Sequence, residues 1–263
     1  MNVPFVNIEL SVTNQDHCEN SAVEVISVIR PQWKSKHVQF EVYTVGITNK
    51  IFSAFVDPSD RIVFRVFGRN TENFIDRDRE LKAMEKLARN HLAAPLHARF
   101  INGIVCGYLP GSTITVDDFT DPSMQKYEYG FFLSFVVPNI DFVSELPNQL
   151  KKIQAIVVPL EEEITFCHND LLVHNILFDP LSERVQFIDY EYADYNYTIF
   201  DLANLFCEFA GVENPDYSRC PDQDGIRDFL KIYLKERYGR VDEKRLIQMT
   251  DRCPLFQAVS END

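Results

Sequence analysis

Residues 167–175 read Cys-His-Asn-Asp-Leu-Leu-Val-His-Asn and fit the pattern H-x-D-x-x-x-x-N, with Asp170 and Asn175 as its acidic and amide members. Shortly afterwards residues 187–191 read Phe-Ile-Asp-Tyr-Glu, so that an apolar run ends in Asp189. This spacing is typical of phosphoryl transfer, in which one aspartate faces a hydroxyl group while an asparagine and a second aspartate hold a metal ion on nucleotide phosphates.

The stretch between the two motifs predicts a hairpin. Residues 175–178 and 184–188 are apolar enough for short strands, and the intervening Asp-Pro-Leu-Ser-Glu has the composition of a turn. A hairpin would bring Asn175 and Asp189 to the same end of a small ribbon. The alternative is a capped loop in which Asp170 and Asn175 only satisfy backbone groups.

The composition restricts the partners of the chain. It has 263 residues, of which 45% are hydrophobic and 13% aromatic, so one large domain or two small ones can be built. The formal net charge of −14 argues against nucleic acid or an anionic membrane as a general partner, and it suits a small cationic substrate.

The sequence lacks an 18-residue apolar stretch, which predicts no stable membrane insertion. The six cysteines form no C-x-x-C pair, so we expect reduced thiols and a cytoplasmic location.

Periodicity predicts an α+β protein with a β-rich N-terminal lobe and a mainly helical C-terminal lobe. We expect a flexible N-terminal arm over residues 1–20, an antiparallel, β-rich N-lobe over 21–110 and a mainly helical C-lobe over 111–263. The N-lobe is predicted to contain helices at 21–29 and 76–90 and strands at 37–44, 51–56, 62–67, 96–100 and 104–109. The C-lobe helices are predicted at 148–158, 199–210, 224–238 and 242–250.

Three features of the N-lobe suit a nucleotide. A loop between the first two predicted strands offers backbone N–H groups to phosphates, although an ordinary hairpin loop fits it too. Arg65 lies on the third strand, where a guanidinium would contact phosphate, and Glu80 on the following helix is placed to pair with it. Both could instead be solvated surface residues. The loop consists of Gly46, Ile47, Thr48 and Asn49.

These motifs resemble the choline/ethanolamine kinase family, and the ethanolamine kinases within it most closely. The similarity covers about residues 25–118 and 140–245. It is carried by Arg-Pro-Gln-Trp at 30–33, Gly-Ile-Thr-Asn-Lys at 46–50, Val-Phe-Arg-Val-Phe-Gly at 63–68, Ile-Asp-Arg-Asp at 75–78, the two motifs quoted above, Tyr-Asn-Tyr at 195–197, Phe-Asp-Leu-Ala-Asn at 200–204 and Glu-Phe-Ala-Gly at 208–211.

The resemblance implies a two-lobed, protein-kinase-like fold. It also implies ATP-dependent, Mg²⁺-dependent phosphorylation of ethanolamine, the first step of the CDP-ethanolamine route to phosphatidylethanolamine. It implies that Asp170 is the base for the substrate hydroxyl, that Asn175 and Asp189 are metal ligands, and that Arg65 and the loop at 46–49 hold phosphates. Glu191, Tyr192 and Glu208 would line the amine pocket, and a homodimer is possible. Asp201 is expected to anchor the catalytic loop.

The sequence departs from the family pattern in two places. A helical segment that the family carries near residues 121–127 is shortened, and the family continues past residue 263 into helices with tryptophans that close the substrate pocket. Other interpretations therefore stay open: a catalytically impaired, pseudokinase-like paralogue or isoform that binds nucleotide or a partner, and a small-molecule kinase for choline or an aminoglycoside.

Overall fold

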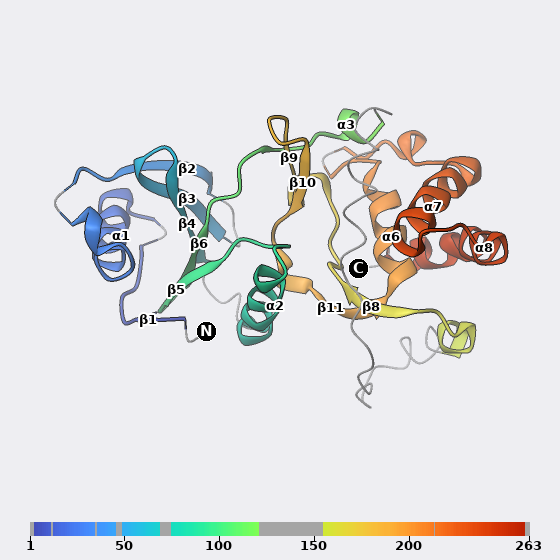
Figure 1. The fold of residues 1–263 in the computed structure, drawn as a ribbon, viewed down its shortest axis with the longest axis horizontal. Coiled ribbons are helices and arrows are strands. Elements are labelled where there is room, and N and C mark those ends of the chain that lie inside the picture. Colours follow the sequence, from blue (N-terminus) through green and yellow to red (C-terminus); the bar gives the residue numbers. More distant parts are fainter. Residues whose placement is uncertain are drawn as a thin grey trace. The chain divides into compact units, whose positions relative to one another are not determined.

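The computed structural model describes residues 3–11, 13–34, 36–45, 49–68, 75–120, 155–212 and 214–260. The chain divides into two compact units, Met1–Leu109 and Pro110–Asp263, and this division falls next to the lobe boundary expected after residue 110. Figure 1 traces the elements of each unit along the chain. None of the helices in the described ranges combines the length and apolar character that a membrane span requires.

The first unit is built on a six-stranded sheet with the order β1-β5-β6-β4-β3-β2, in which β1 is parallel to β5 and all other neighbours are antiparallel. The sheet confirms all five predicted N-lobe strands and adds one at its edge. The strands are β1 (Phe5–Val6), β2 (Gln39–Val45), β3 (Asn49–Asp57), β4 (Asp60–Phe67), β5 (Leu96–Phe100) and β6 (Gly103–Gly107).

One face of this sheet is apolar and is covered by helix α1 (Gln15–Ile29). Phe52 of β3 and Phe64 of β4 lie opposite each other in the register and stack with ring centroids 4.9 Å apart. Val25 and Ile26 of α1 join them in one buried cluster. Because side chains alternate across a strand, the neighbours of Phe64, including Arg65, project from the opposite face.

The expectation of an irregular arm over residues 1–20 is wrong. β1 pairs with β5, Leu10 is buried, and α1 begins at Gln15 rather than at residue 21. The missed signal is Asn14, whose side chain accepts a hydrogen bond from the backbone N–H of His17 and caps the helix. Only isolated apolar residues are buried in this segment, so the sequence shows no hydrophobic periodicity there.

The opposite face of the sheet carries helix α2 (Arg77–Arg89), close to the predicted span of 76–90. Asp76 caps it by accepting a hydrogen bond from the backbone N–H of Arg79. Leu81, Met84 and Leu87 form its buried stripe, and Glu80 is buried beside them.

The second unit contains two small β-structures. In the first, β9 (Ile176–Asp179) pairs with β10 (Arg184–Phe187), which confirms the predicted hairpin, and β9 also pairs with β7 (Ser112–Thr113). In the second, β8 (Ile164–Cys167) pairs with β11 (Asp194–Tyr197), a pairing that the sequence analysis did not predict.

Helices make up most of the rest of the second unit. Helix α6 (Thr198–Glu208) is buried along most of its length and packs against α8 (Glu243–Ser260), and α7 (Gln223–Tyr238) also packs against α8. The rings of Phe206 and Phe229 meet edge to face with centroids 4.9 Å apart. The unit also contains α3 (Val116–Thr120) and 3₁₀ turns at Val158–Leu160, Val173–Asn175, Tyr190–Tyr192 and Tyr217–Arg219.

The predicted C-lobe helices are largely confirmed. α6 and α7 match the predictions at 199–210 and 224–238, whereas α8 continues ten residues beyond the predicted end at 250. Pro254 lies inside this unpredicted extension of the helix. The helix predicted at 148–158 falls mostly outside the described residues.

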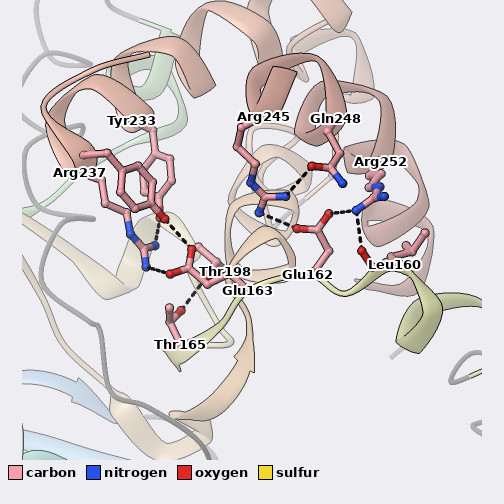
Figure 2. Close-up of polar contacts among 11 residues, drawn as sticks. Leu160, Glu162, Glu163, Thr165, Thr198, Tyr233, Arg237, Arg245, Gln248 and Arg252 are labelled. Carbon is pink, nitrogen blue, oxygen red and sulfur yellow. Dashed lines mark hydrogen bonds and ion pairs between the residues drawn. The ribbon is translucent and has the colours of Figure 1, made fainter. Parts of the chain in front are cut away.

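A polar clamp fixes the segment that enters β8 to the C-terminal helices (Figure 2). Glu162, whose side chain is fully buried, is held by Arg245 at 2.6 Å and by Arg252, both from α8. The adjacent Glu163 accepts hydrogen bonds from Arg237 at 2.7 Å and from the hydroxyl of Tyr238 at 2.6 Å, both at the end of α7. Because β8 leads directly into the motif at 167–175, this clamp helps to fix the start of the candidate catalytic loop.

Glu162→Gln should destabilise the protein by about 2–3 kcal/mol, because one arginine would then face an amide N–H₂ group instead of a carboxylate oxygen. Glu161→Gln is the matched control, since Glu161 is an exposed neighbour. Thermal or urea unfolding of both variants measures the difference. Equal stability of the two variants would contradict the role of the clamp.

Candidate active site

The catalytic-loop motif follows β8 and is anchored to helix α6. The carboxylate of Asp201 accepts hydrogen bonds from the backbone N–H groups of His168 and Asn169, each at 2.8 Å. The side-chain oxygen of Asn204, one turn further along α6, accepts one from the N–H of Leu171 at 2.7 Å. Three of the four amides at 168–171 are therefore held by two side chains of one buried helix, which confirms the expected anchoring role of Asp201.

The hairpin brings Asn175 and Asp189 together as the sequence predicted. Asn175 directly precedes β9, and the N–H of Ile188, which follows β10, donates to the carbonyl of Asn175 at 2.9 Å. The carbonyl of Ile188 in turn accepts a hydrogen bond from Nε2 of His168 at 2.8 Å. Asp189 is the next residue, with φ 64° in the left-handed region.

His168 is a structural link and not a proton carrier. Its ring is buried, which lowers its pKa to about 4, so the imidazole is neutral at physiological pH. Because a carbonyl oxygen only accepts, Nε2 must carry the proton that is donated to Ile188. His168 thus connects the loop that contains Asp170 to the strand end that precedes Asp189.

Asp170 and Asn175 are in direct contact. The Asn175 Nδ2 group donates to the backbone carbonyl and to Oδ2 of Asp170, both at 2.9 Å. This use of the amide hydrogens leaves the amide oxygen of Asn175 for a metal ion. Asp189 supplies carboxylate oxygens from the adjoining strand end, and oxygen ligands of this kind are those that Mg²⁺ prefers.

Asp170 lies among other carboxylates of the same unit. Burial and the nearby charge of Asp189, with a smaller contribution from Glu191, raise the pKa of Asp170 to about 6. Burial and the charge of Asp170 raise the pKa of Glu208 to about 7, and burial raises that of Asp201 to about 6. Such mutually repelling carboxylates are stabilised when cations bind among them.

Of the predicted substrate residues, Glu191 and Glu208 both lie within electrostatic reach of Asp170. Tyr192 is 54% exposed. Its backbone carbonyl accepts a hydrogen bond from the side chain of Asn169 at 3.0 Å, which fixes the turn that contains Glu191 to the catalytic loop.

The candidate phosphate-binding residues of the first unit form a triad. Nη1 of Arg65 on β4 lies 2.7 Å from one carboxylate oxygen of Glu80, which confirms the predicted pairing. Nη1 of Arg77 lies 2.8 Å from the other oxygen, and its guanidinium carbon is 3.9 Å from the ring centroid of Phe67. Glu80 is thus held by two guanidinium groups, one from β4 and one from its own helix.

The predicted loop at 46–49 is only partly described. Asn49 begins β3 and is buried, whereas Gly46, Ile47 and Thr48 lie outside the described residues. Neither Arg77 nor the bridging role of Asn169 was predicted. The sequence did contain a signal for Arg77, which lies three residues before Glu80 on the same predicted helix.

Comparison with known proteins identifies the class. The family model for choline/ethanolamine kinase matches residues 40–127 and 137–262, so the chain belongs to this family. It is 32% identical to ethanolamine kinase 2 of Mus musculus over 90% of this chain and 71% of that protein. It is 31% identical to a probable ethanolamine kinase of Nematostella vectensis over 93% of this chain and 80% of that protein.

A solved structure shows the same fold. An ethanolamine kinase of Plasmodium vivax aligns with a TM-score of 0.78 and 20% identity, covering 94% of this chain and 80% of that chain. The fold is accordingly the α+β, protein-kinase-like fold that the sequence predicted.

Two acid-to-amide substitutions in the same cluster should have opposite effects on stability. Asp170→Asn removes a repelling charge and keeps an oxygen for Asn175, so it should raise the unfolding midpoint of the ligand-free protein at pH 7.5. A gain of 1 kcal/mol corresponds to about 2–4 °C. Asp201→Asn should lower the midpoint, at a cost of about 1–3 kcal/mol, because one loop N–H would face an amide N–H₂ group.

The pH dependence of stability tests whether charge repulsion explains the effect of Asp170→Asn. Folded pKa values of about 6, 6 and 7 for Asp170, Asp201 and Glu208 exceed the ordinary values near 4, so the native state binds more protons than the unfolded state between about pH 4 and pH 7. These groups therefore destabilise the protein progressively as pH rises through that range. The gain from Asp170→Asn should shrink toward pH 4. A gain that does not depend on pH would contradict the charge explanation.

Proposed function

We propose that this protein transfers the terminal phosphoryl group of ATP to the hydroxyl group of ethanolamine, the first step of the CDP-ethanolamine route to phosphatidylethanolamine. The observation that supports this most directly is the anchored Asp170, in contact with Asn175 and surrounded by Asp189, Glu191 and Glu208. The names of its relatives support the same reaction.

Asp170 is proposed as the base that accepts the proton of the substrate hydroxyl. Its pKa of about 6 leaves it mostly ionised at neutral pH and makes it a better proton acceptor than an ordinary aspartate. Asn175 does not compete for that proton, because its Nδ2 group donates to Asp170 and orients the carboxylate. The second carboxylate oxygen, Oδ1, is then the atom assigned to the hydroxyl.

The metal site is proposed at Asn175 and Asp189, which present an amide oxygen and a carboxylate beside Asp170. Mg²⁺ bound there would neutralise the charge of the ATP phosphates. In the first unit, Arg65 is proposed to contact the phosphates together with the loop at Gly46, Ile47, Thr48 and Asn49. Glu80 holds Arg65 in place for this contact.

The amine end of the substrate is proposed to lie against Glu191, Tyr192 and Glu208. A primary ammonium group donates three hydrogen bonds and is strongly hydrated, so carboxylates must replace its water. It also supplies the positive charge that a partly buried Glu208 requires in order to stay ionised at neutral pH.

The substrate choice is tested by measuring transfer of labelled phosphate from Mg·ATP to ethanolamine and to choline side by side. Ethanolamine should be the better substrate, because the trimethylammonium group of choline offers no N–H to Glu191 or Glu208. Choline used equally well or better would contradict the amine assignment. Transfer to neither amine would contradict the proposed function and favour a binding protein without turnover.

Asp189→Ala should abolish Mg²⁺-dependent ATP binding, because the phosphates would lose their main counter-charge. Calorimetry with ATP in the presence of Mg²⁺ and of EDTA provides the measurement. Asp228→Ala, which changes an exposed aspartate on α7, is the matched control and should bind as the unmodified protein does. An unchanged Mg·ATP affinity in Asp189→Ala would remove Asp189 from the site.

A further inference from the structure

Asn169 occupies an unusual backbone position next to Asp170. Its φ of 66° lies in the left-handed region, which residues other than glycine seldom adopt and which asparagine tolerates best. Its backbone N–H is already committed to Asp201 on α6 at 2.8 Å. The backbone of Asn169 is therefore tied to α6.

The side chain of Asn169 bridges two other segments of the second unit. Its Nδ2 group donates to the backbone carbonyl of Tyr192 at 3.0 Å, and its Oδ1 accepts from Nδ2 of Asn196 at 3.0 Å. The orientation of both amides is determined by their partners. The carbonyl of Tyr192 requires a donor from Asn169, and Oδ1 of Asn196 is used by the N–H of Tyr197 at 2.8 Å, so Asn196 presents its nitrogen to Asn169.

The bridge ends on the turn that contains Glu191. Residues Tyr190–Tyr192 form a 3₁₀ turn directly after Asp189, and Glu191 is close enough to contribute to the raised pKa of Asp170. On its other side the bridge ends on β11, which pairs with β8 immediately before the catalytic loop. A hydrogen bond thus connects Asn169, the residue next to the proposed base Asp170, with the turn that contains Glu191, a proposed ligand of the substrate amine.

We propose that Asn169 is a positioning residue for the amine end of the substrate, because its side chain sets the place of the Tyr190–Tyr192 turn, and hence of Glu191, relative to Asp170. This proposal rests on the proposed function. The position calls for a side chain that both donates and accepts hydrogen bonds and that tolerates a positive φ. Glycine meets only the conformational requirement, and alanine meets neither requirement.

The test compares Asn169→Gly and Asn169→Ala with the unmodified protein. Both variants lose the bridge, but only alanine also carries the cost of the left-handed conformation. Both should raise the KM for ethanolamine by about threefold to tenfold, as expected for the loss of the one hydrogen bond that holds the Tyr190–Tyr192 turn. The KM for ATP should stay within about twofold, and the unfolding midpoint should fall further in Asn169→Ala than in Asn169→Gly.

Two further variants serve as controls. Asn214→Gly changes an exposed asparagine that also has a positive φ of 52°, and it should leave both KM values unchanged. Asn196→Ala should raise the KM for ethanolamine, and the double variant Asn169→Gly with Asn196→Ala should be no worse than Asn169→Gly alone, since both act through one bridge.

The outcomes separate this proposal from the proposed function. If the unmodified protein transfers no phosphate to ethanolamine, the proposed function fails. If it does and Asn169→Gly leaves the KM for ethanolamine unchanged, or raises the KM for ATP equally, the positioning role of Asn169 is wrong.

Discussion

The candidate site depends on one buried carboxylate that holds two consecutive backbone amides. Asp201 projects from α6 and accepts hydrogen bonds from His168 and Asn169, so the loop that carries Asp170 is fixed to a helix that is itself packed in the core of its unit. Burial opposes the ionised form of Asp201, and the two hydrogen bonds offset part of that cost. A loop fixed in this way can present a catalytic side chain without further ordering when substrate binds.

The same arrangement concentrates negative charge. Asp189, Glu191 and Glu208 each lie within electrostatic reach of Asp170 in the second unit, and burial adds to the cost of ionising Asp170 and Glu208. A site of this kind is less stable alone than with its cations bound. The proposed ligands supply the missing positive charge in two places: a metal ion at Asn175 and Asp189, and the ammonium group of the substrate near Glu191 and Glu208. Repulsion among these carboxylates would lower the stability of the free protein and favour the binding of cations.

Local patterns allowed much of the fold to be predicted. The β9–β10 hairpin, strands β2 to β6 of the first unit and helices α2, α6 and α7 all follow from residues close to one another in sequence. The pairing of β8 with β11 was missed because its partners are far apart in the chain and because β11 contains Asp194 and Asn196, which are unfavourable in strands. The early start of α1 was missed because it depends on a single capping side chain, Asn14.

The site was predicted to a similar degree. The placing of Asp170, Asn175 and Asp189 followed from the spacing of two motifs and a hairpin between them, and the Arg65–Glu80 pair followed from a strand and the next helix. What the sequence could not show is burial: the raised pKa values of Asp170 and Glu208, and the neutral state of His168, depend on which groups surround them in three dimensions. The second arginine on Glu80, Arg77, could have been predicted, since it lies three residues before Glu80 in the predicted helix.

The central claim is that Asp170 acts as the base in phosphoryl transfer, and it is tested most directly by the turnover of Asp170→Asn with saturating Mg·ATP and ethanolamine. Loss of a general base typically reduces turnover by about 10²–10⁴-fold, and we expect a reduction in this range with Mg·ATP affinity largely retained. A variant that keeps a third of the turnover of the unmodified protein would contradict the assignment of Asp170.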